Sequence, residues 1–163
     1  MTIGGEAYLA SQDAGDTRTQ YGAVCWREGA AGPEVLLITS RDTGRWVIPK
    51  GWPIKGLPPE SSAAREAWEE AGVEGKPDPR CIGLYSYDKL LDKPKGPQVQ
   101  VPCVVAVYAL KVNKLANSFP EAGQRRRKWF SPKKASGKVA EPELRDLLAA
   151  LPAQLADTSH NQG

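Results

Sequence analysis

The chain has 163 residues, a net charge of +3 and a hydrophobic content of 40%. This length suffices for one well-buried core and is short for two, so we expect one domain over residues 19–155, between loose segments 1–18 and 156–163. No apolar run approaches the length of a membrane span, and the N-terminus lacks a signal-peptide pattern. We therefore expect a cytoplasmic protein with no membrane partner.

Cysteine and histidine contribute no site that we can predict. The cysteines Cys25, Cys81 and Cys103 are odd in number, scattered, and set in strand-like contexts typical of buried thiols. Neither a disulfide framework nor a zinc site is indicated. His160 is the only histidine and lies in a polar tail, where a catalytic role is not expected.

Strands and helices alternate without βαβ regularity. The patterns predict strands at 21–26, 34–39, 45–51, 81–87 and 99–112, and one ending at Trp129-Phe130, with helices at 58–71 and 141–151. Mixed order of this kind favours an α+β fold with a mixed sheet over a doubly wound parallel one.

The helix at 58–71 has clear ends and two distinct sides. Pro58 and Pro59 suit a first turn, Glu60 suits the positive end of the helix dipole, and Gly72 suits the left-handed position after the last turn. One side of its helical wheel is apolar and predicts contact with a core; it carries Ala63, Ala64, Ala67, Trp68 and Ala71.

The other side of this helix carries three carboxylates. With Arg65 set at zero, Glu69, Glu66 and Glu70 fall at about 40°, 100° and 140°. Like charges at i,i+3 and i,i+4 spacing oppose helix formation, and no cation is interleaved with Glu66 and Glu70. Oxygen ligands of this kind favour Mg²⁺, with Mn²⁺ as an alternative, and Mg²⁺ commonly leaves positions for substrate phosphates. A solvated acidic face is the simpler interpretation of such a helix, but its surroundings argue against it.

A strand, a loop and this helix together resemble the box of the Nudix hydrolase family. The matching residues are Gly51, Arg65, Glu66, Glu69, Glu70, Gly72 and Val73. Two positions depart from the family pattern: Leu57 stands where the family has its first glutamate, and Ala67 replaces a bulky aliphatic residue. A multi-position motif in its proper setting is far more specific than an isolated glycine pattern. The resemblance implies an α/β/α sandwich with a catalytic strand-loop-helix.

Within that family, residues 18–131 are most similar to diphosphoinositol polyphosphate phosphohydrolases, a subgroup that also handles dinucleoside polyphosphates. The resemblance rests on the strand at 34–39, the segment at 45–49, the box, and the basic run 125–128 before Trp129-Phe130. It implies that substrate phosphates contact Ser40, Arg41, Lys50, Arg125 and, more weakly, Arg18. The loop from Lys89 to Gln98 has no counterpart in the subgroup and is a candidate for shaping the pocket. Trp52 is a candidate for stacking on an adenine or for packing in its loop.

The resemblance implies Mg²⁺-dependent hydrolysis of a phosphoanhydride bond in a small polyphosphate. The implied metal ligands are Glu66, Glu70 and Glu69, with a backbone carbonyl at Lys50 or Gly51. The implied catalytic residues are Glu69 and Glu66, which compete for the role of base, and Arg65, which anchors Glu69. A Nudix-fold sensor or RNA-binding module, or an RNA 5′-end pyrophosphohydrolase, remains an alternative; RNA as the main partner is disfavoured because few aromatic residues flank the basic run. The sequence leaves the exact substrate and the oligomeric state open.

Overall fold

The computed structural model describes residues 17–91 and 99–162. Its strands are β1 (Arg18–Gly29), β2 (Gly32–Thr39), β3 (Trp46–Val47), β4 (Lys50–Gly51), β5 (Val73–Leu91), β6 (Val99–Leu115) and β7 (Arg127–Phe130). Its helices are α2 (Pro59–Ala71), α3 (Pro132–Lys138), α4 (Pro142–Ala149) and α5 (Leu151–Gln162).

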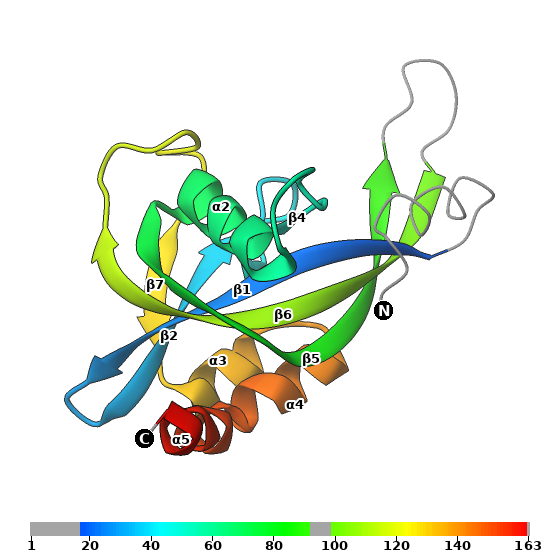
Figure 1. Ribbon diagram of the computed structural model, residues 1–163. Coiled ribbons are helices and arrows are strands. Elements are labelled where there is room, and N and C mark those ends of the chain that lie inside the picture. The colour runs from blue at the N-terminus through cyan, green and yellow to red at the C-terminus, as the bar shows by residue number, and fades with distance from the viewer. Residues whose placement is uncertain (1–16, 92–98, 163) are drawn as a thin grey trace.

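The strands form one mixed sheet. Its main path runs β3-β2-β1-β6-β5, with β4 paired to β1 and β7 paired to β2. The β1–β6 pair is parallel, whereas the other pairs are antiparallel. Figure 1 shows β5 and β6 as long, curved strands that extend beyond the helices. The α+β class with a mixed sheet is therefore confirmed.

Two helical layers cover the sheet and give the expected α/β/α sandwich. On one face, Ala63, Ala67 and Ala71 of α2 are fully buried against strand residues. On the other face, α3, α4 and α5 bury Leu144, Leu148 and other apolar residues against the opposite sides of the same strands (Figure 1). Because the side chains that α2 packs against the sheet are small alanines, the helix axis lies close to β1. The acidic side of α2 lies next to this contact and is not covered by it.

The ends of α2 follow the sequence signals. Pro58 is the N-cap, in extended conformation, and Pro59 begins the helix. Gly72 adopts the left-handed conformation with φ of 69°, and its N–H bonds to the carbonyl of Trp68 at 2.9 Å. A side chain at position 72 would be strained there and would also collide with Phe119. The prediction of a helix at 58–71 is thus correct to within one residue.

Other elements differ from the sequence-based expectations. The segment 45–51 forms two short strands rather than one, and β5 begins eight residues earlier than the expected 81–87 strand because Val73 to Pro77 also pair with β6. The helix α3 was not predicted; Ser131 caps it by accepting the Lys134 N–H at 3.2 Å. The helix expected at 141–151 ends at Ala149, and Pro152 lies in the first turn of α5.

Only part of the segments that we expected to be loose lies within the described residues, so only that part can be compared with the structure. Residues 1–16 and most of the Lys89–Gln98 loop lie outside the described residues. At the C-terminus, α5 continues to Gln162, where the sequence led us to expect a loose tail from residue 156. None of the described helices has the length and apolar character needed to span a membrane.

Candidate active site

The three carboxylates of α2 lie beside the short strand β4. Glu66, Glu69 and Glu70 are all partly buried. The backbone of Gly51 lies directly against Glu66, because a Cβ atom added at position 51 would overlap the Glu66 carboxyl group. The Lys50 N–H points at Glu70 and lies 3.4 Å from its Oε1 atom. The antiparallel pairing of β4 with β1 fixes this approach, since Lys50 pairs with Gly22.

Burial and crowding raise the pKa of both Glu66 and Glu70. The pKa of Glu66 rises from 4.5 to about 7, first because burial penalises the charged form and then because Glu70, Glu69 and Glu121 repel it. A hydrogen bond between the Glu66 and Glu70 carboxyl groups contributes to the rise. Burial also raises the pKa of Glu70, while Arg125 and Lys50 oppose that rise. A cation at this position would favour the charged form of both carboxyl groups and so oppose the rise in their pKa.

A fourth carboxylate, Glu121, completes the acidic cluster, and the sequence patterns did not predict it. Its backbone N–H donates to the Glu69 carbonyl at 3.0 Å, which ties the loop before β7 to α2. Its negative charge raises the pKa of both Glu66 and Glu70. One signal was present in the sequence, because Glu121 precedes Arg125 by four residues.

Two arginines border the cluster at Glu121. Arg125 is 11% exposed and bonds to Glu121 Oε1 through Nε and Nη2, at 3.3 and 3.2 Å. Its Nη1 donates to the Thr39 carbonyl at 3.2 Å. Arg41 is half-exposed and lies 3.8 Å from the same Glu121 oxygen, with a 3.0 Å bond to Gln124. The structure therefore brings Arg41 and Arg125 together at one side of the carboxylates, as their predicted shared role requires.

Ser40 begins the turn that carries Arg41. Its Oγ atom lies 2.7 Å from the Thr43 hydroxyl and accepts the Thr43 N–H at 3.3 Å. Its carbonyl accepts the Gly44 N–H, and its own N–H donates to Arg45. These bonds hold the turn in place, so the Ser40 hydroxyl supports the shape of the Arg41 loop in the structure.

Lys50 links the carboxylates to a second basic region. Its backbone faces Glu70, while its ammonium group lies 4.8 Å from the ring centre of Tyr87. Burial lowers the pKa of Lys50, with Lys89 and Arg45 acting in the same direction and Glu70 and Glu141 against it. Arg18 pairs with Cys103 across β1 and β6, and Cys103 pairs with Tyr87 across β6 and β5. Arg18, Lys50 and Lys89 therefore gather around one end of the sheet.

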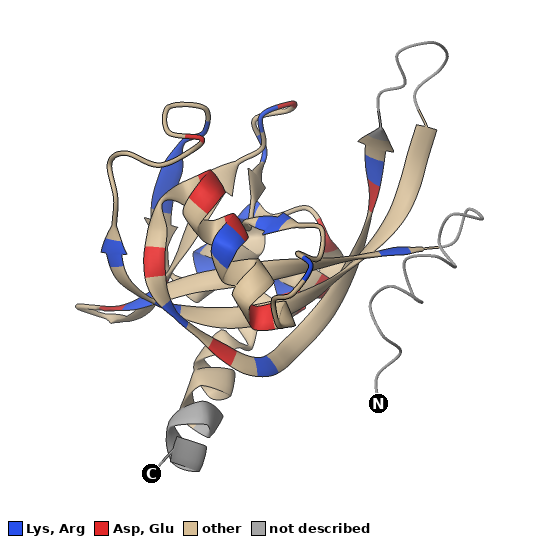
Figure 2. Ribbon diagram, turned by 45° about the horizontal axis from the view of Figure 1, so that its top comes forward, with Lys and Arg blue, Asp and Glu red and all other residues tan. Residues whose placement is uncertain are grey.

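The remaining basic residues near β7 have different surroundings. Arg125 precedes β7, so the alternation of that strand does not place it on one face with Arg127. Arg127 donates through Nη1 to the carbonyls of Ala71 and Ala116 at 2.8 and 2.9 Å, so it stabilises the C-terminal end of α2. Arg126 lies over the ring of Trp46. Figure 2 shows Lys and Arg positions on strands and loops around α2, which itself carries acidic positions.

Arg65 lies on the exposed side of α2. The ion pairs found between described residues do not include one between Arg65 and Glu69. The anchoring role implied for Arg65 therefore has no contact to support it in this conformation.

The donor set fits a hard divalent cation. Glu66 and Glu70 offer carboxylate oxygens, and the backbone of Gly51 lies against the Glu66 carboxyl group. Within residues 17–91 and 99–162, no three acidic, cysteine or histidine side chains converge into a ready-made metal cage.

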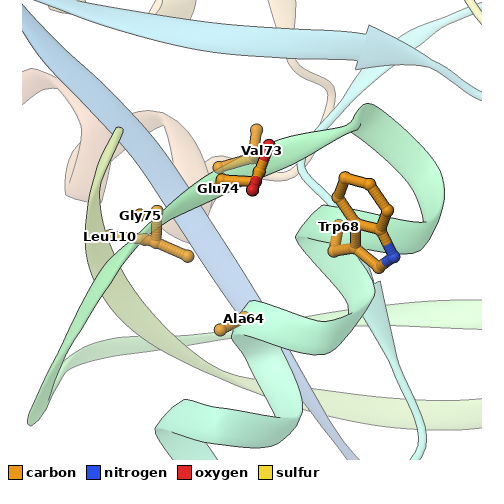
Figure 3. A pocket seen from close by; sticks show the side chains of 6 residues that line it. All are labelled: Ala64, Trp68, Val73, Glu74, Gly75 and Leu110. Atoms are coloured by element: carbon orange, nitrogen blue, oxygen red, sulfur yellow. The ribbon is translucent and has the colours of Figure 1, made fainter. Parts of the chain in front are cut away.

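An apolar hollow of about 300 Å³ lies on the opposite side of α2. Ala64 and Trp68 line it from the helix, and Val73, Glu74, Gly75 and Leu110 line it from the sheet (Figure 3). It holds none of the carboxylates of the acidic cluster, so it is separate from the candidate metal and phosphate site.

A family model for the NUDIX domain matches residues 17–151, which include the acidic cluster and both basic regions. The chain belongs to the Nudix family. This confirms the resemblance seen in the strand-loop-helix motif. The match extends well beyond the motif and covers every strand and the helices α2, α3 and α4.

Curated relatives of this Nudix domain include inositol-phosphate enzymes. Human diphosphoinositol polyphosphate phosphohydrolase 3-alpha is 30% identical over 109 residues, which are 66% of this chain and 60% of that protein. Arabidopsis thaliana Nudix hydrolase 16, mitochondrial, is 33% identical over 119 residues, covering 71% of this chain and 63% of the relative. The chain thus spans somewhat less than two thirds of the length of these relatives.

Solved structures give the same fold. The C. elegans Ap4A hydrolase binary complex matches with a TM-score of 0.58 and 22% identity, over 86% of this Nudix chain and 99% of that one. A second C. elegans Ap4A hydrolase structure matches with a TM-score of 0.59 at 21% identity, with the same coverage.

Proposed function

We propose that this Nudix protein hydrolyses a phosphoanhydride bond in a small polyphosphate. The observation that carries the proposal is the partly buried Glu66–Glu70 carboxyl pair, held against the backbone of β4 with two arginines at its border. Phosphoryl transfer needs a cation held by carboxylates and, beside it, guanidinium groups that bind the phosphates. This site offers both kinds of group. The relatives named above support this class of substrate.

Glu66 and Glu70 would hold Mg²⁺ or Mn²⁺, together with a main-chain carbonyl of Lys50 or Gly51. When bound, the ion neutralises phosphate charge and lowers the pKa of an attacking water. Glu69, one turn from Glu66, orients that water and takes its proton. Glu121 holds Arg125 in place through two bonds, which leaves the arginine positioned for the phosphate that departs.

The two basic regions hold the phosphates on either side of the bond that breaks. Arg41 and Arg125 form one side, while Lys50 and Arg18 form the other. Because Lys50 reaches both Glu70 and Tyr87, a substrate that spans the metal position would meet its ammonium group next. Guanidinium and ammonium groups recognise phosphates and not the group that joins them, so both diphosphoinositol polyphosphates and dinucleoside polyphosphates fit. Trp52 is 36% exposed and offers a ring that could stack on a base.

A panel of phosphoanhydrides, with products identified by mass spectrometry, tests the proposal. We expect turnover that requires Mg²⁺, is lost in the Glu70→Gln variant, and is retained in Glu74→Gln, whose carboxylate is exposed on β5. Binding of the same compounds without turnover, unaffected by EDTA, would instead identify a sensor. Release of pyrophosphate from 5′-triphosphorylated RNA alone would identify the RNA 5′-end enzyme.

A further inference from the structure

The strand β5 ends the main path of the sheet, so one of its edges is not paired with a described strand. Its inner edge pairs with β6 from Val73 to Leu91. Figure 1 shows the later part of β5 extending with β6 beyond the helical layers. Edge strands expose main-chain donors and acceptors that can pair with another chain, and proteins commonly protect them.

The two halves of this edge are protected differently. The first half contains Pro77 and Pro79, and the pairing with β6 shifts register at three places between Glu74 and Gly83. Prolines and bulges prevent regular pairing along an edge. From Gly83 onward the register is regular, and the strand contains no proline. This second half is therefore suited to take a further strand.

The regular half also exposes apolar side chains. Leu84 is 58% exposed and Leu90 is 55% exposed. Within the described part of the chain, Trp52 is the only other large apolar residue of comparable exposure. Single exposed apolar residues are common on protein surfaces, but two exposed leucines within seven residues of one strand indicate an interaction surface.

The main-chain groups of alternate residues point outward. The Ser86 N–H donates to Oε1 of Glu143 on α4 at 3.2 Å, so it faces away from β6. Because direction alternates along a strand, the N–H and carbonyl groups of Leu84, Asp88 and Leu90 face the same way. An added strand would therefore displace the Glu143 side chain. Main-chain hydrogen bonds between the two strands would replace the bond that Glu143 accepts.

Residues 84–90 read Leu-Tyr-Ser-Tyr-Asp-Lys-Leu, with a leucine three residues before Tyr87 and another three residues after it. If two copies pair antiparallel about that residue, Leu84 lies opposite Leu90 and Ser86 lies opposite Asp88. All four are residues whose main-chain groups face outward, as a hydrogen-bonded pair requires. No like charges meet, and each exposed leucine gains an apolar partner.

We propose that the outer edge of β5 over residues 84–90 docks a second copy of this chain, joining two sheets through a two-fold axis at Tyr87. The self-complementary sequence favours a second copy over an unrelated partner, because a two-fold interface places the same strip on both sides. The added strand is held mainly by main-chain hydrogen bonds, and the leucine pairs fix its register.

Sedimentation across a concentration series tests this pairing. We expect the wild-type chain to reach twice the mass of one copy, and the Leu84→Lys/Leu90→Lys variant to remain at the mass of one copy while it unfolds at the wild-type temperature. The matched control is Glu74→Lys, which changes charge in the protected half of β5 and should still dimerise. A wild-type chain that stays monomeric at every concentration overturns the proposal, as does a dimer that survives the leucine changes.

Disulfide trapping tests the register. In a Cys81→Ser background, which removes the exposed thiol, Ser86→Cys/Asp88→Cys should form covalent dimers on mild oxidation because opposite residues lie within reach of a disulfide. In the single variants Ser86→Cys and Asp88→Cys, the two thiols of a dimer are not opposite each other, because each is offset by two residues along the paired strands. These variants should form no covalent dimer. Cross-linking of the single variants to the same extent, or none in the double variant, contradicts pairing about Tyr87.

Discussion

The backbone of Gly51 lies so close to the carboxyl group of Glu66 that no side chain fits between them. This contact places the end of β4 against the acidic side of α2, and it explains why a glycine is needed here although its φ is not in the left-handed region. The glycine allows the main chain of β4 to lie next to the Glu66 carboxyl group.

Gly51→Ala should therefore damage both the fold and the site. We expect a loss of about 1–3 kcal/mol in the free energy of unfolding, because the new methyl group must push Glu66 aside. Hydrolysis should fall together with Mg²⁺ affinity. Gly137→Ala in α3 is the control: an added Cβ meets nothing there, and the change should stabilise the helix by about 0.5–1 kcal/mol. Equal melting temperatures for Gly51→Ala and wild type would contradict the close approach.

Glu70→Gln should abolish Mg²⁺-dependent turnover while leaving the fold intact. Removing one anionic ligand weakens the hold on the cation, and we expect kcat to fall by roughly a hundredfold or more. The variant should unfold at or above the wild-type temperature, because burial penalises the charged form of Glu70 and raises its pKa, and glutamine carries no charge. Steady-state kinetics and melting temperatures of Glu70→Gln, measured with Glu74→Gln as the control, separate the effect on turnover from the effect on stability. A Glu70→Gln enzyme with wild-type kcat would remove Glu70 from the site.

Arg125→Ala and Arg41→Ala should affect catalysis in different ways. Arg125 is nearly buried and fixed by Glu121 and Thr39, so its loss should lower kcat. Arg41 is half-exposed, with a longer contact to Glu121; its loss should raise KM by about tenfold, or about 1.4 kcal/mol, with a smaller change in kcat. Measuring both constants for both variants tests the division, and identical profiles would argue against it.

The metal-free protein should become less stable as pH rises through the acidic range. Since the pKa of Glu66 is about 7 in the folded state and 4.5 otherwise, the folded chain binds more protons than the unfolded chain between these values. Stability from this group is therefore present below pH 4.5 and is lost as pH approaches 7. The melting temperature in EDTA should fall over this window, and Glu66→Gln should flatten the fall.

Saturating Mg²⁺ provides the control for the pH series. The cation competes with the proton on Glu66, so its stabilising effect should grow as pH rises toward 7. A melting temperature that rises with pH in EDTA, to the same degree in wild type and Glu66→Gln, would show that the carboxyl pair does not hold a proton in the folded chain.

Local signals in the sequence were enough to predict α2 and its two sides. The alanine stripe, the prolines at the start and Gly72 at the end act within one helix, so the fold follows them closely. The same holds for β2, which contains the apolar run from Val35 to Ile38. The missed helix α3 also had a local signal, because Ser131 and Pro132 form a cap and a first turn.

Features that depend on distant contacts were not predictable from the sequence. Glu121 lies about fifty residues beyond Glu70, and only the folded loop brings it to α2 through the Glu69 carbonyl. The role of Arg127 at the end of α2 was likewise missed, since the alternation of a strand says which side a residue faces but not what it meets. The start of β5 at Val73 follows from its pairing with β6, which a window on 73–80 with its two prolines does not reveal.

The most direct test of the central claim is an anomalous diffraction map from a crystal soaked in Mn²⁺ with a non-hydrolysable phosphoanhydride. We predict a peak between Glu66, Glu70 and the main chain of β4, with oxygen ligands at about 2.0–2.3 Å and a substrate phosphate on the ion. Arg41 and Arg125 should contact the neighbouring phosphate. A map with no anomalous peak there, and with the ligand bound elsewhere, would contradict the account.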